Sequence, residues 1–109
     1  MSGRATLGRT VLLLGALCCL GGKASGPKTA TIAVDMLAFG PAPTGLRVGD
    51  TVEWVNRDIF LHSATDAAGG FDVRLPPGGR GRVVLKRPGT IDYYCRFHPG
   101  MKGRLVVAR

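Results

Sequence analysis

The chain has 109 residues, which is the length of a single domain, and its 15 basic and 7 acidic residues give a formal net charge of +8. No long run of apolar residues recurs at helical spacing, which argues against a helical fold. The basic residues are scattered and do not alternate with aromatic residues, so a nucleic-acid partner is not expected.

The beginning of the chain has the pattern of a secretory signal peptide. Arg4 and Arg9 precede an apolar run over 11–20, and small residues follow it. The run is shorter than the about 20 apolar residues that span a membrane. We therefore predict a signal peptide over 1–24, export to the periplasm and no stable membrane insertion of the mature chain; an uncleaved N-terminal anchor is the alternative.

Removal of this leader changes the charge and the cysteine count. It takes away three basic residues and no acidic ones, so residues 25–109 carry 12 basic and 7 acidic residues, a net charge of +5. It also removes two of the three cysteines and leaves Cys95 alone. A single thiol in an oxidising compartment must be buried, bonded to a partner or bound to a metal.

Short runs of alternating apolar and polar residues, separated by glycine and proline, fill the rest of the chain. Such runs predict strands, and they cover residues 29–36, 45–50, 51–56, 61–65, 71–75, 82–86, 90–95 and 104–108. About seven short strands with glycine-rich turns predict an all-β Greek-key sandwich, with a small barrel as the alternative. The predicted core residues are Met36, Val52, Trp54, Val83, Leu85 and Val107, and Arg57 and Asp58 are predicted to form a solvated turn.

Three soft or borderline metal ligands lie close together near the end of the chain. Cys95, His98 and Met101 follow one another at Cys-x2-His-x2-Met spacing, and His62 is the only other histidine. Segments distant in sequence can meet at one end of a Greek-key sandwich. A thiolate and two imidazoles in a plane, with a weak axial thioether, suit copper in both oxidation states. Zinc would more usually collect a fourth cysteine or histidine.

The sequence is also compatible with other roles for Cys95. Cys95 can be an inert buried thiol, or a nucleophile paired with His62 or His98. A thiol hydrolase needs an orienting third group and an oxyanion hole, and the sequence supplies a candidate for neither. The pairing of Trp54 with Tyr93 is also found in immunoglobulin domains, but those need a second cysteine on an earlier strand.

Several motifs, in order, resemble those of the cupredoxins, the small blue-copper proteins. They are the segment VGDTVEWVNRD over 48–58, the histidine that follows it, PGTIDYYC over 88–95 and HPGMKGRLVV over 98–107. The resemblance covers about residues 29–108. The Cys-x2-His-x2-Met spacing is the tight version of the family's ligand loop, and other members have longer loops.

The resemblance implies a site and a function. His62, Cys95 and His98 correspond to the equatorial ligands of one type 1 copper ion that alternates between Cu(I) and Cu(II), and Met101 corresponds to the axial ligand. It implies an exported, monomeric electron-transport protein that is not an enzyme and that carries one electron at a time between donor and acceptor proteins. The alternative is a periplasmic protein that binds and delivers copper without an electron-transfer role.

Docking of the redox partners is expected around His98, one edge of which should reach solvent. The apolar residues expected around it are Phe39, Leu61, Pro77, Phe97 and Pro99. Arg96 and Lys102 would attract acidic partners. One departure from the family is Ser63, where asparagine usually follows the first histidine ligand. The shorter hydroxyl is expected to tie the two ligand loops less well and to change the reduction potential.

Overall fold

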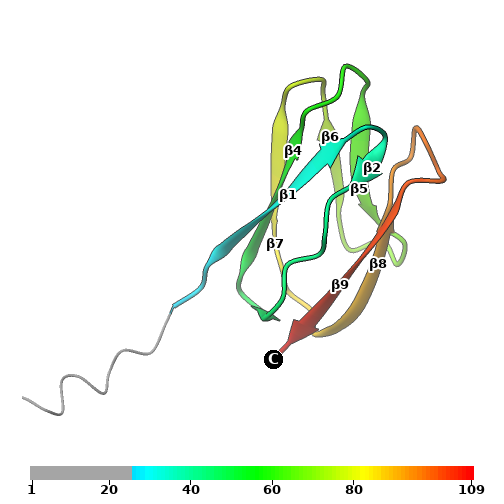
Figure 1. Ribbon diagram of the computed structural model, residues 1–109. Helices are drawn as coiled ribbons and strands as arrows, with labels where there is room; N and C mark the ends of the chain where they lie inside the picture. The colour runs from blue at the N-terminus through cyan, green and yellow to red at the C-terminus, as the bar shows by residue number, and fades with distance from the viewer. Residues whose placement is uncertain (1–25) are drawn as a thin grey trace, which may run out of the picture.

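The computed structural model describes residues 26–109, so the predicted signal peptide lies outside the described residues. Nine strands follow one another in this part of the chain (Figure 1). Their bounds are β1 Thr29–Asp35, β2 Ala38–Phe39, β3 Leu46–Arg47, β4 Thr51–Asn56, β5 His62–Asp66, β6 Asp72–Leu75, β7 Arg80–Val84, β8 Gly89–Tyr94 and β9 Lys102–Ala108.

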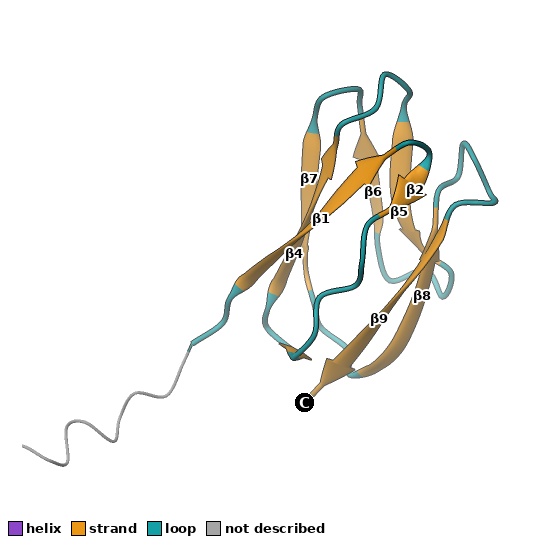
Figure 2. Cartoon of the chain, viewed as in Figure 1, coloured by secondary structure: helices purple, strands orange, loops and turns teal. Residues whose placement is uncertain are grey.

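The strands form two sheets, which confirms the predicted all-β sandwich. One sheet has the order β2-β1-β4-β7 and the other has the order β3-β9-β8-β5-β6. The pairs β1–β4 and β3–β9 are parallel, and the remaining pairs are antiparallel. The count exceeds the predicted number of about seven, and the two-residue strand β2 lies outside every predicted range. Between residues 26 and 109 the chain contains only strands, turns and loops (Figure 2), and no helix there could cross a membrane.

The core lies between the sheets and is built from residues two apart along each strand. Val52 and Trp54 on β4 are fully buried, as predicted. The Trp54 ring lies 5.4 Å from the ring of Tyr93 on β8, at 70° to it, which is an edge-to-face contact between the two sheets. Predicted core residues Leu85 and Val107 are also buried, and Val83 is partly buried against the same cluster.

Met36 was predicted to lie in the core, and this prediction is wrong, because its side chain is 85% exposed. The alternation of β1 ends at Asp35, and the chain turns back at Met36 and Leu37 to form β2, which the sequence did not predict. Both residues have positive φ, 52° and 59°. That conformation is usual for glycine, asparagine or aspartate in a tight hairpin and is unfavourable for these two side chains.

Two loops at one end of the sandwich bring distant parts of the chain together. The loop between β4 and β5 and the loop between β8 and β9 both lie at the end opposite the C-terminus (Figure 1). Within the second sheet, β5 pairs directly with β8, with Thr65 opposite Tyr94. The first residue of β5, His62, and the first residue after β8, Cys95, therefore lie next to each other.

Candidate metal centre

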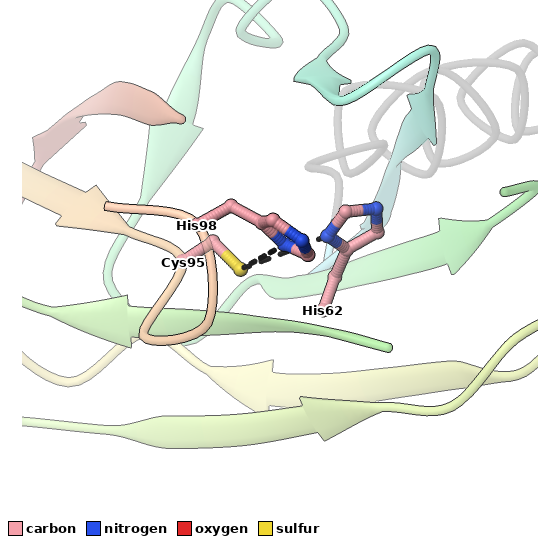
Figure 3. A group of neighbouring side chains, drawn as sticks. All are labelled: His62, Cys95 and His98. Atoms are coloured by element: carbon pink, nitrogen blue, oxygen red, sulfur yellow. Dashed lines mark hydrogen bonds between the residues drawn. The ribbon is translucent and has the colours of Figure 1, made fainter. Parts of the chain in front are cut away.

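His62, Cys95 and His98 form one cluster at this end of the sandwich. Their ligand atoms all lie within 4.8 Å of one another. Cys95 Sγ is 3.6 Å from His62 Nδ1 and 3.7 Å from His98 Nδ1, and the sulfur and both nitrogens point toward one another (Figure 3). The predicted meeting of the late thiol and the early imidazole is therefore found.

The spacing of these atoms suits a shared metal ion. Sulfur and nitrogen bonded to one ion at about 2.3 and 2.0–2.1 Å, with an angle between tetrahedral and trigonal, lie about 3.5–3.8 Å apart. The two sulfur–nitrogen separations fall in this range. Cys95 and His62 are fully buried and His98 is partly exposed, so a bound ion would be shielded from water except on the His98 side.

Met101 closes the ligand loop next to Cys95. The Cys95 backbone N–H donates to the Met101 carbonyl at 3.1 Å, and the Met101 N–H donates to the His98 carbonyl at 2.8 Å. Met101 is 6% exposed and belongs to the same buried cluster as Cys95. The two hydrogen bonds hold residues 95–101 in a short closed loop, which brings the thioether residue back beside the thiol.

Asp58 was predicted to lie in a solvated turn, and this prediction is wrong. Its carboxylate lies 2.8 Å from His62 Nε2, and its side chain is only 9% exposed. Burial opposes ionisation, but hydrogen bonds from the Leu37 N–H, His62 and the Met36 N–H outweigh it and hold the pKa of Asp58 below its ordinary 3.8. The carboxylate is an acceptor, so Nε2 of His62 carries the proton and Nδ1 has a free lone pair facing Cys95.

Asn56 positions the loop that carries Asp58 and leads to His62. Its Nδ2 donates to the Phe60 carbonyl at 2.8 Å and to the Leu75 carbonyl at 2.9 Å, and its Oδ1 accepts the Asp58 N–H at 2.9 Å. The side chain is 1% exposed. A buried amide with its donors and acceptor satisfied fixes the path of residues 57–61 and therefore the place at which β5 begins.

Ser63 contacts Cys95 and the residue after it. The Ser63 backbone N–H donates to Cys95 Sγ at 3.4 Å, which stabilises negative charge on the sulfur. The Ser63 hydroxyl accepts the Arg96 N–H at 2.8 Å. The hydroxyl therefore ties the two ligand loops together directly.

An aromatic ring lies next to the partly exposed His98, and other exposed apolar residues stand near the ligands in the sequence. The Phe60 ring lies 6.0 Å from the imidazole and is 45% exposed, while Ile59 is 82% and Phe97 40% exposed. Pro99 is exposed, as expected, and so is Pro77. Ile59 and Phe60 were not among the residues predicted around His98, although they stand directly before Leu61 and His62.

Two members of the predicted patch lie deeper than expected. Leu61 is only partly exposed. Phe39 is also half-buried, because its ring packs against the edge of the buried Tyr93 ring with 4.7 Å between centroids. Four exposed apolar residues stand beside the two histidine ligands in the sequence, namely Ile59, Phe60, Phe97 and Pro99, and we call these four residues the apolar patch. Pro77, which is also exposed, follows β6 and is not included.

No family model matches the chain. Amicyanin of Paracoccus denitrificans is 34% identical to it over 77 residues, which is 57% of this chain and 52% of that protein. Plastocyanin of a Synechococcus strain is 29% identical over 87 residues, 65% of this chain and 64% of that protein. The matched region thus spans about half to two-thirds of the length of these relatives.

Solved structures of amicyanin have the same fold. A copper(I) form of an amicyanin mutant superposes with a TM-score of 0.62 at 26% identity, covering 72% of this chain and 81% of that one. An oxidised form of another mutant also gives 0.62 at 26% identity, covering 80% and 87%.

The β-sandwich with a Cys, two His and a Met at one end has the fold and the ligand set of the cupredoxins. Among cupredoxins, the chain is similar to amicyanin and plastocyanin. The cluster of His62, Cys95, His98 and Met101 matches a type 1 copper site, which binds one copper ion.

Proposed function

We propose that the protein is an exported type 1 copper protein that carries one electron at a time between redox partners. The observation that carries the proposal is the convergence of the Cys95 thiol with His62 and His98 at separations that suit one ion. In this proposal His62, Cys95 and His98 are the equatorial ligands and Met101 is the axial one. The bound ion supplies the redox chemistry by alternating between Cu(II) and Cu(I).

The surrounding residues support this role by holding the ligands still. Asp58 fixes the tautomer and the orientation of His62, and Ser63 bonds both to the Cys95 sulfur and to the following amide. Ligands that are held by other hydrogen bonds move little when the charge of the site changes. A small change in geometry favours fast transfer of an electron.

The partly exposed His98 is the proposed exit for the electron. It lies within the apolar patch, and redox encounters require only a small contact area. Exposed Arg96 lies within the ligand loop and exposed Lys102 directly follows it, and both would attract acidic partners. Contact at this patch is proposed to place a donor or acceptor next to the imidazole edge.

The proposal includes the location and the state of the protein. The pattern of residues 1–24 supports secretion to the periplasm, and the folded domain is proposed to act there as a monomer without enzymatic activity.

The rival function is storage or delivery of copper without electron traffic. The rate of electron self-exchange, measured by NMR line broadening in mixtures of the oxidised and reduced protein, separates the two. An electron carrier exchanges rapidly and keeps its copper in the presence of a chelator. Slow exchange together with rapid loss of copper to the chelator would instead support the delivery role.

A further inference from the structure

A closed circuit of hydrogen bonds joins β5 and β6 to the residue after Cys95. The Arg96 N–H donates to Ser63 Oγ at 2.8 Å, and Ser63 Oγ lies 2.8 Å from Thr65 Oγ1. Thr65 Oγ1 donates to Asp72 Oδ1 at 2.8 Å. The Arg96 Nε–H donates to the same carboxylate oxygen of Asp72 at 2.9 Å and thereby closes the circuit.

The direction of every hydrogen bond in the circuit is determined. The Asp72 carboxylate only accepts, so Thr65 uses its single hydroxyl proton on Asp72. Ser63 must then donate its own proton to Thr65, and its oxygen is free to accept from the Arg96 amide. Hydrogen bonds that run in one direction polarise and strengthen one another.

The strand geometry places these side chains together. Ser63 and Thr65 are two residues apart on β5 and therefore point to the same face of the sheet. Asp72 on β6 lies directly opposite Thr65 in the antiparallel pairing. Ser63 is fully buried and Thr65 is 8% exposed, while the Arg96–Asp72 pair lies at the surface. The circuit thus runs from the buried sulfur environment to solvent.

Arg96 also contacts the apolar patch. Its guanidinium carbon lies 4.9 Å from the centre of the Phe97 ring. Hydrogen bonds from Thr65 and from Arg96 hold the pKa of Asp72 below its ordinary 3.8, so the carboxylate is charged at neutral pH. Arg96 therefore contacts the Asp72 carboxylate on β6, the Ser63 hydroxyl and the Phe97 ring of the apolar patch.

We propose that Thr65, Asp72 and Arg96 are positioning residues for the copper site, and that they act by holding the Ser63 hydroxyl on the Arg96 amide. This inference rests on the proposed copper function. In this chain the three residues support the hydroxyl that ties the two ligand loops together. Through Ser63 they act on Cys95 in two ways, because the Ser63 hydroxyl holds the amide of the next residue, Arg96, and the Ser63 N–H donates to the Cys95 sulfur.

The chain offers a matched control for the surface part of the circuit. Arg104 Nε donates to Asp92 Oδ1 at 2.7 Å between β9 and β8, and both side chains are more than half exposed. This pair has the same chemistry and the same atoms as Arg96 and Asp72, but its only side-chain hydrogen bond among residues 26–109 is the one within the pair. Asp92→Asn therefore removes an equivalent ion pair that lacks the connection to Ser63.

The test compares Asp72→Asn, Thr65→Val and Thr65→Ser with Asp92→Asn. The first readout is hydrogen exchange of the Arg96 amide in the copper-free protein. We expect exchange to become roughly tenfold faster in Asp72→Asn and Thr65→Val, because the Ser63 hydroxyl is then held less firmly and its hydrogen bond with the Arg96 amide opens more often. Thr65→Ser keeps the hydroxyl and Asp92→Asn leaves the circuit intact. In both variants the exchange rate of the Arg96 amide should therefore stay within about twofold of the wild-type rate.

The second readout is the rate at which the loaded protein loses copper to a chelator. We expect this rate to rise roughly tenfold in Asp72→Asn and Thr65→Val and to stay near the wild-type value in the two others. The Asp72 side chain is half exposed, so its replacement by asparagine leaves the core unchanged. The inference would be overturned if Asp72→Asn showed the wild-type rate of Arg96 amide exchange and the wild-type rate of copper loss. A wild-type protein that binds no copper would overturn the proposed function instead, and Arg96 amide exchange would still report on the circuit.

Discussion

His62 Nε2 lies 2.8 Å from Asp58 Oδ2, four residues earlier in the chain, in a site that is nearly closed to solvent. The same carboxylate accepts the Met36 N–H at 2.7 Å and the Leu37 N–H at 2.9 Å. One side chain therefore orients a candidate copper ligand and stabilises a turn whose two residues have unfavourable positive φ.

Replacement of Asp58 by asparagine should weaken copper binding by about 10- to 100-fold, because His62 loses the charged acceptor that fixes its tautomer. Titration of the copper-free protein with Cu(II) against a competing chelator measures this. Asp35→Asn, a change of an exposed carboxylate on β1, is the control and should bind copper normally. Unchanged affinity in Asp58→Asn would show that the carboxylate does not orient His62.

Substitution of Gly103 by alanine should destabilise the copper-free protein by about 1–3 kcal/mol, because the added Cβ would overlap the ring of Tyr93 in the tightly packed core. Chemical denaturation measures the change in the free energy of unfolding. Gly100→Ala is the control, since no atom lies within 4 Å of its Cβ position. Equal stability of the two variants would mean that the Tyr93 ring moves aside without cost.

The strands that the sequence predicts best are those whose inward side is apolar over the whole length. The bounds predicted for β4 match the structure, because Val52 and Trp54 alternate with polar or half-buried neighbours. The cluster was also predictable, since Cys95, His98 and His62 have few alternative roles in a chain that is predicted to be exported. Their meeting follows from the pairing of β5 with β8.

The features that the sequence did not predict depend on contacts between distant residues. The turn at Met36 contains no glycine or asparagine, and its positive φ is supported by Asp58, which lies 22 residues later. The contact between the Asp58 carboxylate and His62 Nε2 was not predicted either, because it depends on the folded path of the loop between β4 and β5. The support of the Ser63 hydroxyl by Thr65 and by Asp72 on the neighbouring strand was also not predicted.

The stability of the copper-free protein should depend on Asp50 between about pH 4 and pH 2. Hydrogen bonds from the Lys28 and Arg47 amides lower the pKa of Asp50 to about 2 in the folded protein, from an ordinary 3.8. A lowered pKa in the folded state stabilises the protein fully above pH 3.8, and this contribution is lost as the pH falls through about 2.

Asp50→Asn should therefore be less stable than the wild-type protein at pH 6, and the difference should shrink as the pH falls to 2. Denaturant unfolding at a series of pH values measures the difference. A difference in unfolding free energy that stays constant over this interval would contradict the assignment of this titration to Asp50.

A charge in the apolar patch should slow electron self-exchange without changing the copper site. In Phe60→Glu we expect the self-exchange rate to fall roughly tenfold, because a hydrated carboxylate replaces the aromatic ring beside His98 and must lose water when two molecules meet. Val106→Glu, which places the same charge near the C-terminal end of β9, is the control and should exchange at the wild-type rate. Equal rates in the two variants would place electron transfer elsewhere on the surface.

The central claim is that a copper ion is bonded to the Cys95 thiolate between His62 and His98. A visible absorption spectrum of the oxidised, copper-loaded protein tests it most directly. We predict an intense band toward the red end of the spectrum, from charge transfer between sulfur and Cu(II), that is absent in Cys95→Ser. A protein that stays colourless with copper and instead binds one zinc ion would contradict the claim.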